Sequence, residues 1–179
     1  MKKIIFLIAA ILFSLNTFAQ QVALTDAISI DIPMGAQKIT KEQVIAYVIK
    51  KFNPEKLILD NYTDLPARHS YKIDDVLVLL NPFDSTKVEL RKGYMLSLKK
   101  GLDEMNHGNS TYTSSFKKVN NNSVVIINYI AGNIEYYHFY CRNVNNARAL
   151  NGTIQFDQAD KDKATAILEH ILNSIKFKD

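Results

Sequence analysis

Apolar side chains recur along the first part of this chain at two spacings, one typical of strands and one of helices. Residues 28–32 alternate between isoleucine and a polar residue, which predicts a half-buried strand, and the turn residues at 33–35 end it. Apolar residues at three- and four-residue spacing then predict a helix through about residue 52. Thr40 caps this helix, with Gln43 as its capping-box partner.

The signals that follow this helix are weaker. Residues 57–59 could form a short strand, and residues 60–71 have the composition of a loop. The continuous apolar run at 76–80 has the length of a buried strand, which Asn81 and Pro82 close.

A second helix is predicted between this strand and the turn residues at 106–109. Asp84 or Ser85 starts it, and an apolar stripe at helical spacing continues to its end. Gly93 and Gly101 each weaken it by up to about 1 kcal/mol relative to alanine.

The second half of the chain is dominated by strands joined by short turns, which is typical of hairpins. The predicted strands are residues 111–119, 123–130, 134–142 and 150–156. Asp157 or Asp160 then caps a last helix with the clearest amphipathic stripe in the chain, and residues 174–178 form a closing edge strand.

This order of elements predicts an α+β fold, an antiparallel β-sheet meander between about three helices. The strand at 123–130 is almost entirely apolar, whereas a strand with one solvated face would alternate. We therefore expect helices on both faces of the sheet, in an α/β/α arrangement.

The N-terminus carries an export signal. Lys2 and Lys3 precede the apolar run 4–13, and small residues lead up to Ala19, which is the pattern of a secretory signal peptide. We expect cleavage near Ala19, which divides the chain into a signal peptide (1–19), a short loose leader (20–26) and a single domain (27–179). The apolar run is shorter than the roughly 20 residues of a membrane span, and we expect no span in the mature chain.

Export changes what the composition means. The chain has 179 residues and a net charge of +4, and without Lys2 and Lys3 its 20 basic and 18 acidic side chains leave +2. No run of basic residues indicates nucleic-acid binding. The single cysteine, Cys141, lies far from the cleavage site, so we expect a periplasmic or extracellular protein that is not a lipoprotein. In that oxidising compartment we expect Cys141 to be a buried core residue.

Residues that could carry chemistry are scattered. The four histidines (His69, His107, His138 and His170) occur singly, without the clustering that a metal site needs, so we expect neither a metal nor a cofactor. The acidic pairs at 74–75 and 103–104 and the acidic group at 157–162 fit solvated turns and helix caps. No nucleophile elbow or phosphate-binding glycine loop is present.

One group of aromatic residues suggests a binding surface. Tyr136, His138 and Tyr140 alternate along one predicted strand and therefore share a face. Tyrosine combines an apolar ring with a polar tip and is enriched at interfaces. We take these three residues as a candidate partner surface, with packing beneath helices as the alternative.

Two segments resemble the PsbP-like domains, whose fold is shared by the nuclear-import factors that bind the GTPase Ran. These segments are the opening strand with its Pro-x-Gly turn (residues 30–35) and the closing strand, helix and strand (residues 151–156 and 171–177). The resemblance implies the α/β/α fold and a non-catalytic accessory role, in an exported bacterial member of that superfamily. It assigns no functional residue.

Three hypotheses follow for function, and a non-enzyme is favoured. The first is an exported accessory or binding domain with a protein partner in the cell envelope. The second is a periplasmic hydrolase whose site is assembled from scattered residues such as His69, Asp74 and His138. The third is a carrier of a small apolar ligand held between sheet and helices.

Overall fold

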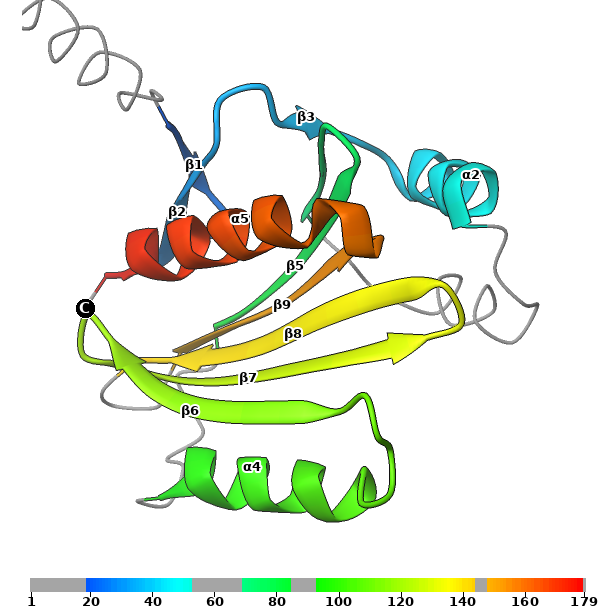
Figure 1. Ribbon diagram of the computed structural model, residues 1–179. Coiled ribbons are helices and arrows are strands. Elements are labelled where there is room, and N and C mark those ends of the chain that lie inside the picture. The colour runs from blue at the N-terminus through cyan, green and yellow to red at the C-terminus, as the bar shows by residue number, and fades with distance from the viewer. Residues whose placement is uncertain (1–18, 53–68, 85–92, 144–147, 179) are drawn as a thin grey trace, which may run out of the picture.

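The computed structural model describes residues 19–52, 69–84, 93–143 and 148–178 (Figure 1). In these residues the strands form two antiparallel sheets, one of seven strands in the order β3-β4-β5-β9-β8-β7-β6 and one of three in the order β1-β2-β10. The strands are β1 (Gln20–Ala23), β2 (Ile28–Ile32), β3 (Gln37–Lys38), β4 (His69–Ile73), β5 (Val76–Asp84), β6 (Thr113–Val119), β7 (Asn122–Ala131), β8 (Ile134–Arg142), β9 (Arg148–Phe156) and β10 (Lys176–Phe177). The helices are α2 (Lys41–Phe52), α4 (Tyr94–Met105), α5 (Lys161–Ser174) and the short 3₁₀ helix η1 (Gln158–Asp160).

The helices cover both faces of the larger sheet, as the sequence predicts. On one face α5 packs together with the three-stranded sheet, and in Figure 1 it crosses in front of β5 and β9. On the other face α2 packs over β5 and β8, whereas α4 packs over β6 and β7. This is the expected α+β architecture, and an antiparallel meander, β6 to β9, makes up one side of the main sheet.

Strand β7 shows why a continuous apolar run is needed here. Val124 faces the core beneath α5, whereas Val125 and Ile127 face the core beneath α4. Successive side chains of a strand point to opposite faces, so only a strand covered on both sides is apolar at every position.

Strand β2 has the predicted alternation but a different place in the fold. Ile28, Ile30 and Ile32 are fully buried against α5, as expected. The strand does not join the main sheet, however, because it pairs with β1 and with the closing strand β10. Ser174, the last residue of α5, links this helix to β2, because its hydroxyl accepts from the Asp31 N–H at 3.0 Å.

Several boundaries differ from those predicted. The leader is not loose throughout, because Gln20–Ala23 forms β1 on the edge of β2. The loop predicted at 60–71 is wrong at its end, where His69 begins β4. Asn81 and Pro82 do not close β5, which continues to Asp84 paired with β9. Within the described residues, β4 pairs with β5 only as far as Leu80, so Pro82, which lacks an N–H, lies beyond that described pairing.

The second predicted helix begins later in the structure than the sequence predicts. Asp84 belongs to β5, so it does not begin a helix, and Ser85 and the strand predicted at 57–59 lie outside the described residues. Helix α4 begins after Gly93, whose φ of 88° makes it the N-terminal cap rather than an interior residue. Its predicted end is confirmed, since Asn106 is the C-cap.

Helix α2 begins with the capping box that the sequence predicts. The Thr40 N–H donates to the Gln43 side-chain oxygen at 2.8 Å, and the Gln43 N–H donates back to the Thr40 hydroxyl at 3.4 Å. This reciprocal pair satisfies two of the N–H groups that a helix leaves without partners at its start.

Candidate functional site

The face of the main sheet that α2 and α4 cover carries a strip of polar side chains between the two helices. Cross-strand pairing places Asn81, Asn151 and Tyr140 side by side on β5, β9 and β8. The next row along the strands is Leu79, Thr153 and His138. We call the five polar residues of these two rows the polar strip: Asn81, Tyr140, His138, Asn151 and Thr153.

Two of the three residues predicted as a partner surface belong to this strip. Tyr136, His138 and Tyr140 do share one face of β8, as alternation requires. Tyr136 is only 5% exposed, however, because it packs in the core beneath α2 with Leu77 and Phe52. The predicted surface is therefore corrected to His138 and Tyr140, which are half-buried.

His138 is held firmly at the centre of the strip. Its Nε2 lies 2.9 Å from the Tyr129 hydroxyl and its Nδ1 lies 2.7 Å from the Thr153 hydroxyl. Its ring also stacks on the rings of Tyr129 and Tyr136, with centroids 5.4 and 6.0 Å away. Burial lowers the pKa of His138 to about 4, so the imidazole is neutral at physiological pH.

These contacts decide what His138 can do chemically. A neutral imidazole donates one hydrogen bond and accepts one, and both positions are occupied by hydroxyl groups of the protein. Burial also raises the pKa of Tyr129 to about 12, so its hydroxyl keeps its proton. A general base needs a free acceptor close to its substrate and a pKa near the working pH, and His138 has neither.

A small cavity of about 90 Å³ lies against the strip. It is lined by side chains of the polar strip and by the backbone where β8 and β9 run side by side. The side-chain oxygen of Asn151 is buried here and has no hydrogen-bond partner in the described residues. A buried acceptor without a partner costs about 1–3 kcal/mol, so the cavity has a place for a polar group or a water molecule.

Gly152 is required at this position by close packing from the opposite face. A Cβ atom at Gly152 would collide with the Phe139 ring and would lie 3.0 Å from a methyl group of Leu80. Phe139 and Leu80 belong to the core beneath α5, so this glycine lets that core approach the β9 backbone directly. The backbone between Asn151 and Thr153 is thereby held in place behind the cavity.

The hydrolase site considered from the sequence is not assembled. His69 pairs with Leu80 and faces the α5 side of the sheet, whereas His138 faces the α2 and α4 side. Asp74 lies in the β4–β5 turn, about 16 Å along the strand from His69 at roughly 3.3 Å per residue. A catalytic group needs hydrogen-bond reach to its partner, and these three residues do not converge.

Cys141 is a core residue, as predicted. It is fully buried beneath α5 on the same face of β8 as Phe139 and Tyr137. Burial raises the pKa of its thiol to about 12, which keeps the reactive thiolate form negligible at neutral pH.

The acidic residues serve structural contacts. The Asp103 carboxylate accepts from Lys99 at 2.6 Å and from Tyr112 at 3.0 Å, which fixes α4 against the start of β6. Asp157, predicted as one of two possible caps of the last helix, instead caps the preceding 3₁₀ helix η1 by accepting from the Ala159 N–H. Asp160 does not cap α5 with its side chain but pairs with Lys51 at 3.0 Å. In the described part of the chain, no three metal-ligating side chains gather into a group.

The sequence does not indicate that Asn81 and Asn151 belong to one site, and the reasons can be identified. Asn81 resembles a strand terminator in the sequence because Pro82 follows it, and Asn151 lies in a predicted strand whose neighbours in the sheet the sequence does not specify. Their proximity depends on the register of β5 with β9, two strands that are far apart in the sequence. The one local signal is the polarity of Asn81 directly after the apolar run of β5.

The comparisons with known proteins bear on the fold. No protein-family model matches the chain, and no curated protein matches it. The cyanobacterial PsbP protein (CyanoP) of Synechocystis aligns at 8% identity over 90% of this chain and 93% of its own, with a TM-score of 0.50. This likeness confirms the PsbP-like fold that the sequence resemblance implied. No helix in the described residues is long and apolar enough to span a membrane.

Two further structures align with weaker scores. The Ran-binding protein Mog1p of Saccharomyces cerevisiae aligns at 10% identity over 92% of this chain and 97% of its own, with a TM-score of 0.47. LpqN of Mycobacterium tuberculosis, described as involved in cell envelope biogenesis, aligns at 6% identity over 96% and 97%, with a TM-score of 0.43.

Proposed function

We propose that this chain, with its PsbP-like fold, is an exported, non-catalytic accessory domain that binds a protein partner in the cell envelope through the polar strip. The observation that carries the proposal is the state of His138, a neutral imidazole that hydrogen bonds hold on both nitrogens. Such a residue shapes a rigid binding surface and does not shuttle protons.

The composition of the strip supports a protein ligand. Tyr140 offers an aromatic ring with a hydroxyl group, and Asn151 offers a buried oxygen that still lacks a donor. Tyrosine is enriched where proteins recognise other proteins because it contributes contact area, and asparagine supplies adaptable hydrogen bonds in antibody binding loops. Phe83, which lies one row beyond Asn81 on β5, is 56% exposed and extends the strip with an apolar anchor.

Site-specific photocrosslinking in the native envelope tests this proposal. A photoreactive phenylalanine replaces Phe83 or Tyr140, and matched probes replace Ile49 on α2 and Met105 on α4, which are exposed away from the strip. We expect the two strip positions to capture one and the same protein, saturably, and the matched positions not to capture it. Capture of unrelated proteins, equal capture from all four positions, or no capture would contradict the proposal.

Export has its own test. If a signal peptidase cuts after Ala19, the mature protein begins at Gln20, the first residue of β1. Intact-mass measurement and N-terminal sequencing of protein recovered from outside the cytoplasm should therefore find Gln20, within a residue or two, as the first residue. A mature protein that retains Met1 would contradict the export of a processed domain.

A further inference from the structure

A second cavity lies on the opposite side of the molecule from the polar strip, along the outer flank of α5. It has a volume of about 320 Å³, within the range of small-molecule sites. Its walls are the turn after β2, the turn between β4 and β5, and one face of α5, and it is lined by Pro33, Met34, Ile73, Asp74, Lys163, Ala166, Ile167 and His170.

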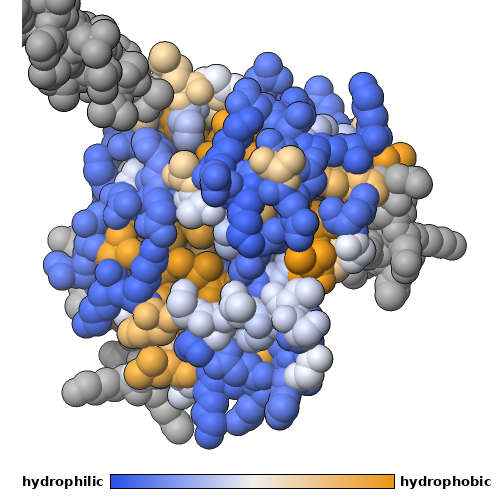
Figure 2. Space-filling view, in the orientation of Figure 1, coloured by the Kyte–Doolittle hydropathy of each residue, from blue (hydrophilic) through white to orange (hydrophobic). Residues whose placement is uncertain are grey.

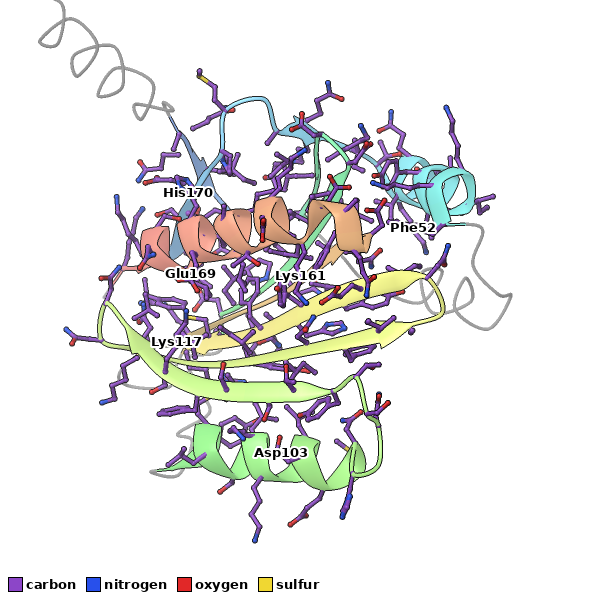
Figure 3. The ribbon with its side chains drawn as sticks, in the orientation of Figure 1. Phe52, Asp103, Lys117, Lys161, Glu169 and His170 are labelled. Carbon is purple, nitrogen blue, oxygen red and sulfur yellow. The ribbon has the colours of Figure 1, made fainter. Side chains whose placement is uncertain are left out.

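The α5 wall of this groove has polar ends and an apolar middle. Lys163, Ala166, Ile167 and His170 follow one another at helical spacing, so they form a single line along the helix. The two polar ends lie seven positions apart along the helix, a distance of about 10 Å. Figure 3 shows His170 on the side of α5 toward β2, whereas the neighbouring Glu169 lies toward Lys117, with which it forms an ion pair at 2.6 Å.

One ring nitrogen of His170, the Nε2 atom, is buried without a hydrogen bond among the described residues. Buried polar atoms in folded proteins are almost always hydrogen-bonded, and each exception needs an explanation. A ligand group or a water molecule in the groove would supply the missing bond.

The other polar end carries a positive charge, and one of its two acidic partners is largely exposed. The Lys163 ammonium lies 3.3 Å from an Asp74 oxygen and 3.6 Å from an Asp160 oxygen. The Asp74 side chain is 73% exposed, and ion pairs so exposed contribute little to stability. An incoming carboxylate can therefore replace Asp74 at Lys163 at little cost.

The walls between these ends suit an aliphatic chain. Ile167 and Ile73 are buried at the base of the groove, and Met34 is 62% exposed above it. Methionine is flexible and polarisable and adapts to apolar ligands of irregular shape. An aliphatic segment in the groove would remove the Met34 side chain from water.

We propose that this groove binds a linear carboxylic acid, with the carboxylate at Lys163, an aliphatic middle beneath Met34 and a second hydrogen-bonding group at the Nε2 atom of His170. The volume, the 10 Å spacing of the two polar ends and the unpaired nitrogen together define this class of ligand. The site is independent of the polar strip, and it gives the third hypothesis from the sequence, a small-ligand carrier, a specific location outside the core.

Three probes of equal chain length test the proposal on the full mature domain. We expect 8-hydroxyoctanoate to bind and to shift the backbone amide signals of Met34, Ile167 and His170 in NMR spectra, together with the imidazole nitrogen signals of His170. Octanoate lacks the second polar group and octane-1,8-diol lacks the carboxylate, and each should bind about fivefold more weakly.

Two variants test which side chain of the groove recognises each polar end of the ligand. Lys163→Met keeps the aliphatic part of the side chain and should abolish the preference for hydroxyoctanoate over the diol. His170→Phe keeps a ring and should abolish the preference for hydroxyoctanoate over octanoate. Lys100→Met on α4 and His107→Gln in the turn after it are the matched controls and should bind as the unchanged protein does.

The outcomes separate the alternatives. Equal binding of all three probes would show an apolar groove without head-group recognition and would overturn the proposal. Absence of binding, or shifts confined to residues outside the groove, would overturn it as well.

Discussion

Lowering the pH from 7 to 4 is expected to destabilise the folded protein by about 3 kcal/mol through His138. Burial lowers the pKa of His138 from 6.5 to about 4 in the folded state, whereas an unfolded chain leaves it at 6.5. Between these two values the unfolded state binds a proton that the folded state does not, so stability falls as the pH falls. At 1.36 kcal/mol per pH unit, this interval corresponds to about 3 kcal/mol.

Urea denaturation from pH 4 to 7.5 measures this effect. Carboxylates also titrate in this range, so the informative quantity is the difference between the unchanged protein and His138→Gln. The variant should lose about 3 kcal/mol of the pH dependence, whatever its stability at pH 7. His107→Gln, altered in the turn after α4, is the matched control and should follow the unchanged protein. A His138→Gln curve parallel to that of the unchanged protein would refute a buried neutral histidine.

Gly152→Ala is expected to cost about 3 kcal/mol of folding free energy, although it adds only one methyl group. The new Cβ would collide with the Phe139 ring on one side and would press on Leu80 on the other. Both neighbours are fully buried in the core beneath α5, so neither can move away without repacking that core. The same substitution would shift the β9 backbone that lines the small cavity.

Gly101→Ala is the matched control, because a Cβ at this position of α4 meets no atom within 4 Å. It should stabilise the protein by roughly 0.5–1 kcal/mol, since alanine favours a helix interior. Thermal or urea denaturation of both variants measures the contrast. The double variant Gly152→Ala with Phe139→Leu should recover part of the loss, because the smaller side chain makes room. A Gly152→Ala protein as stable as the unchanged one would contradict the assigned packing.

The elements that could be predicted are those whose signals are local. The capping box of Thr40 and Gln43, the apolar stripe of α5, and the turns that join β6 to β7 and β7 to β8 are each formed by residues close together in the sequence. Helix capping and hairpin turns act over that distance, so the chain carries their signature directly. The start of β4 at His69 and the continuation of β5 past Pro82 depend on partner strands instead.

The candidate sites divide in the same way. Alternation alone places Tyr136, His138 and Tyr140 on one face of β8. Whether each side chain is exposed depends on how far α2 extends over the sheet. Tyr136 packs beneath α2 and is buried, whereas Tyr140 is half-buried. His170 shows the same limit, because the groove beside it is completed by two turns far away in the sequence, at Met34 and at Asp74.

The amino-acid sequence by itself determined the class of this protein: an α+β domain with helices on both faces of an antiparallel sheet, and with a buried cysteine. These properties follow from periodicity and composition, which can be determined from each segment of the sequence without knowledge of its neighbours in the fold. The tertiary structure decided that β2 leaves the main sheet, that Asn81 meets Asn151, and that His69 and His138 lie on opposite faces. Such facts depend on the register between distant strands, because a shift of one residue exchanges the faces of every side chain.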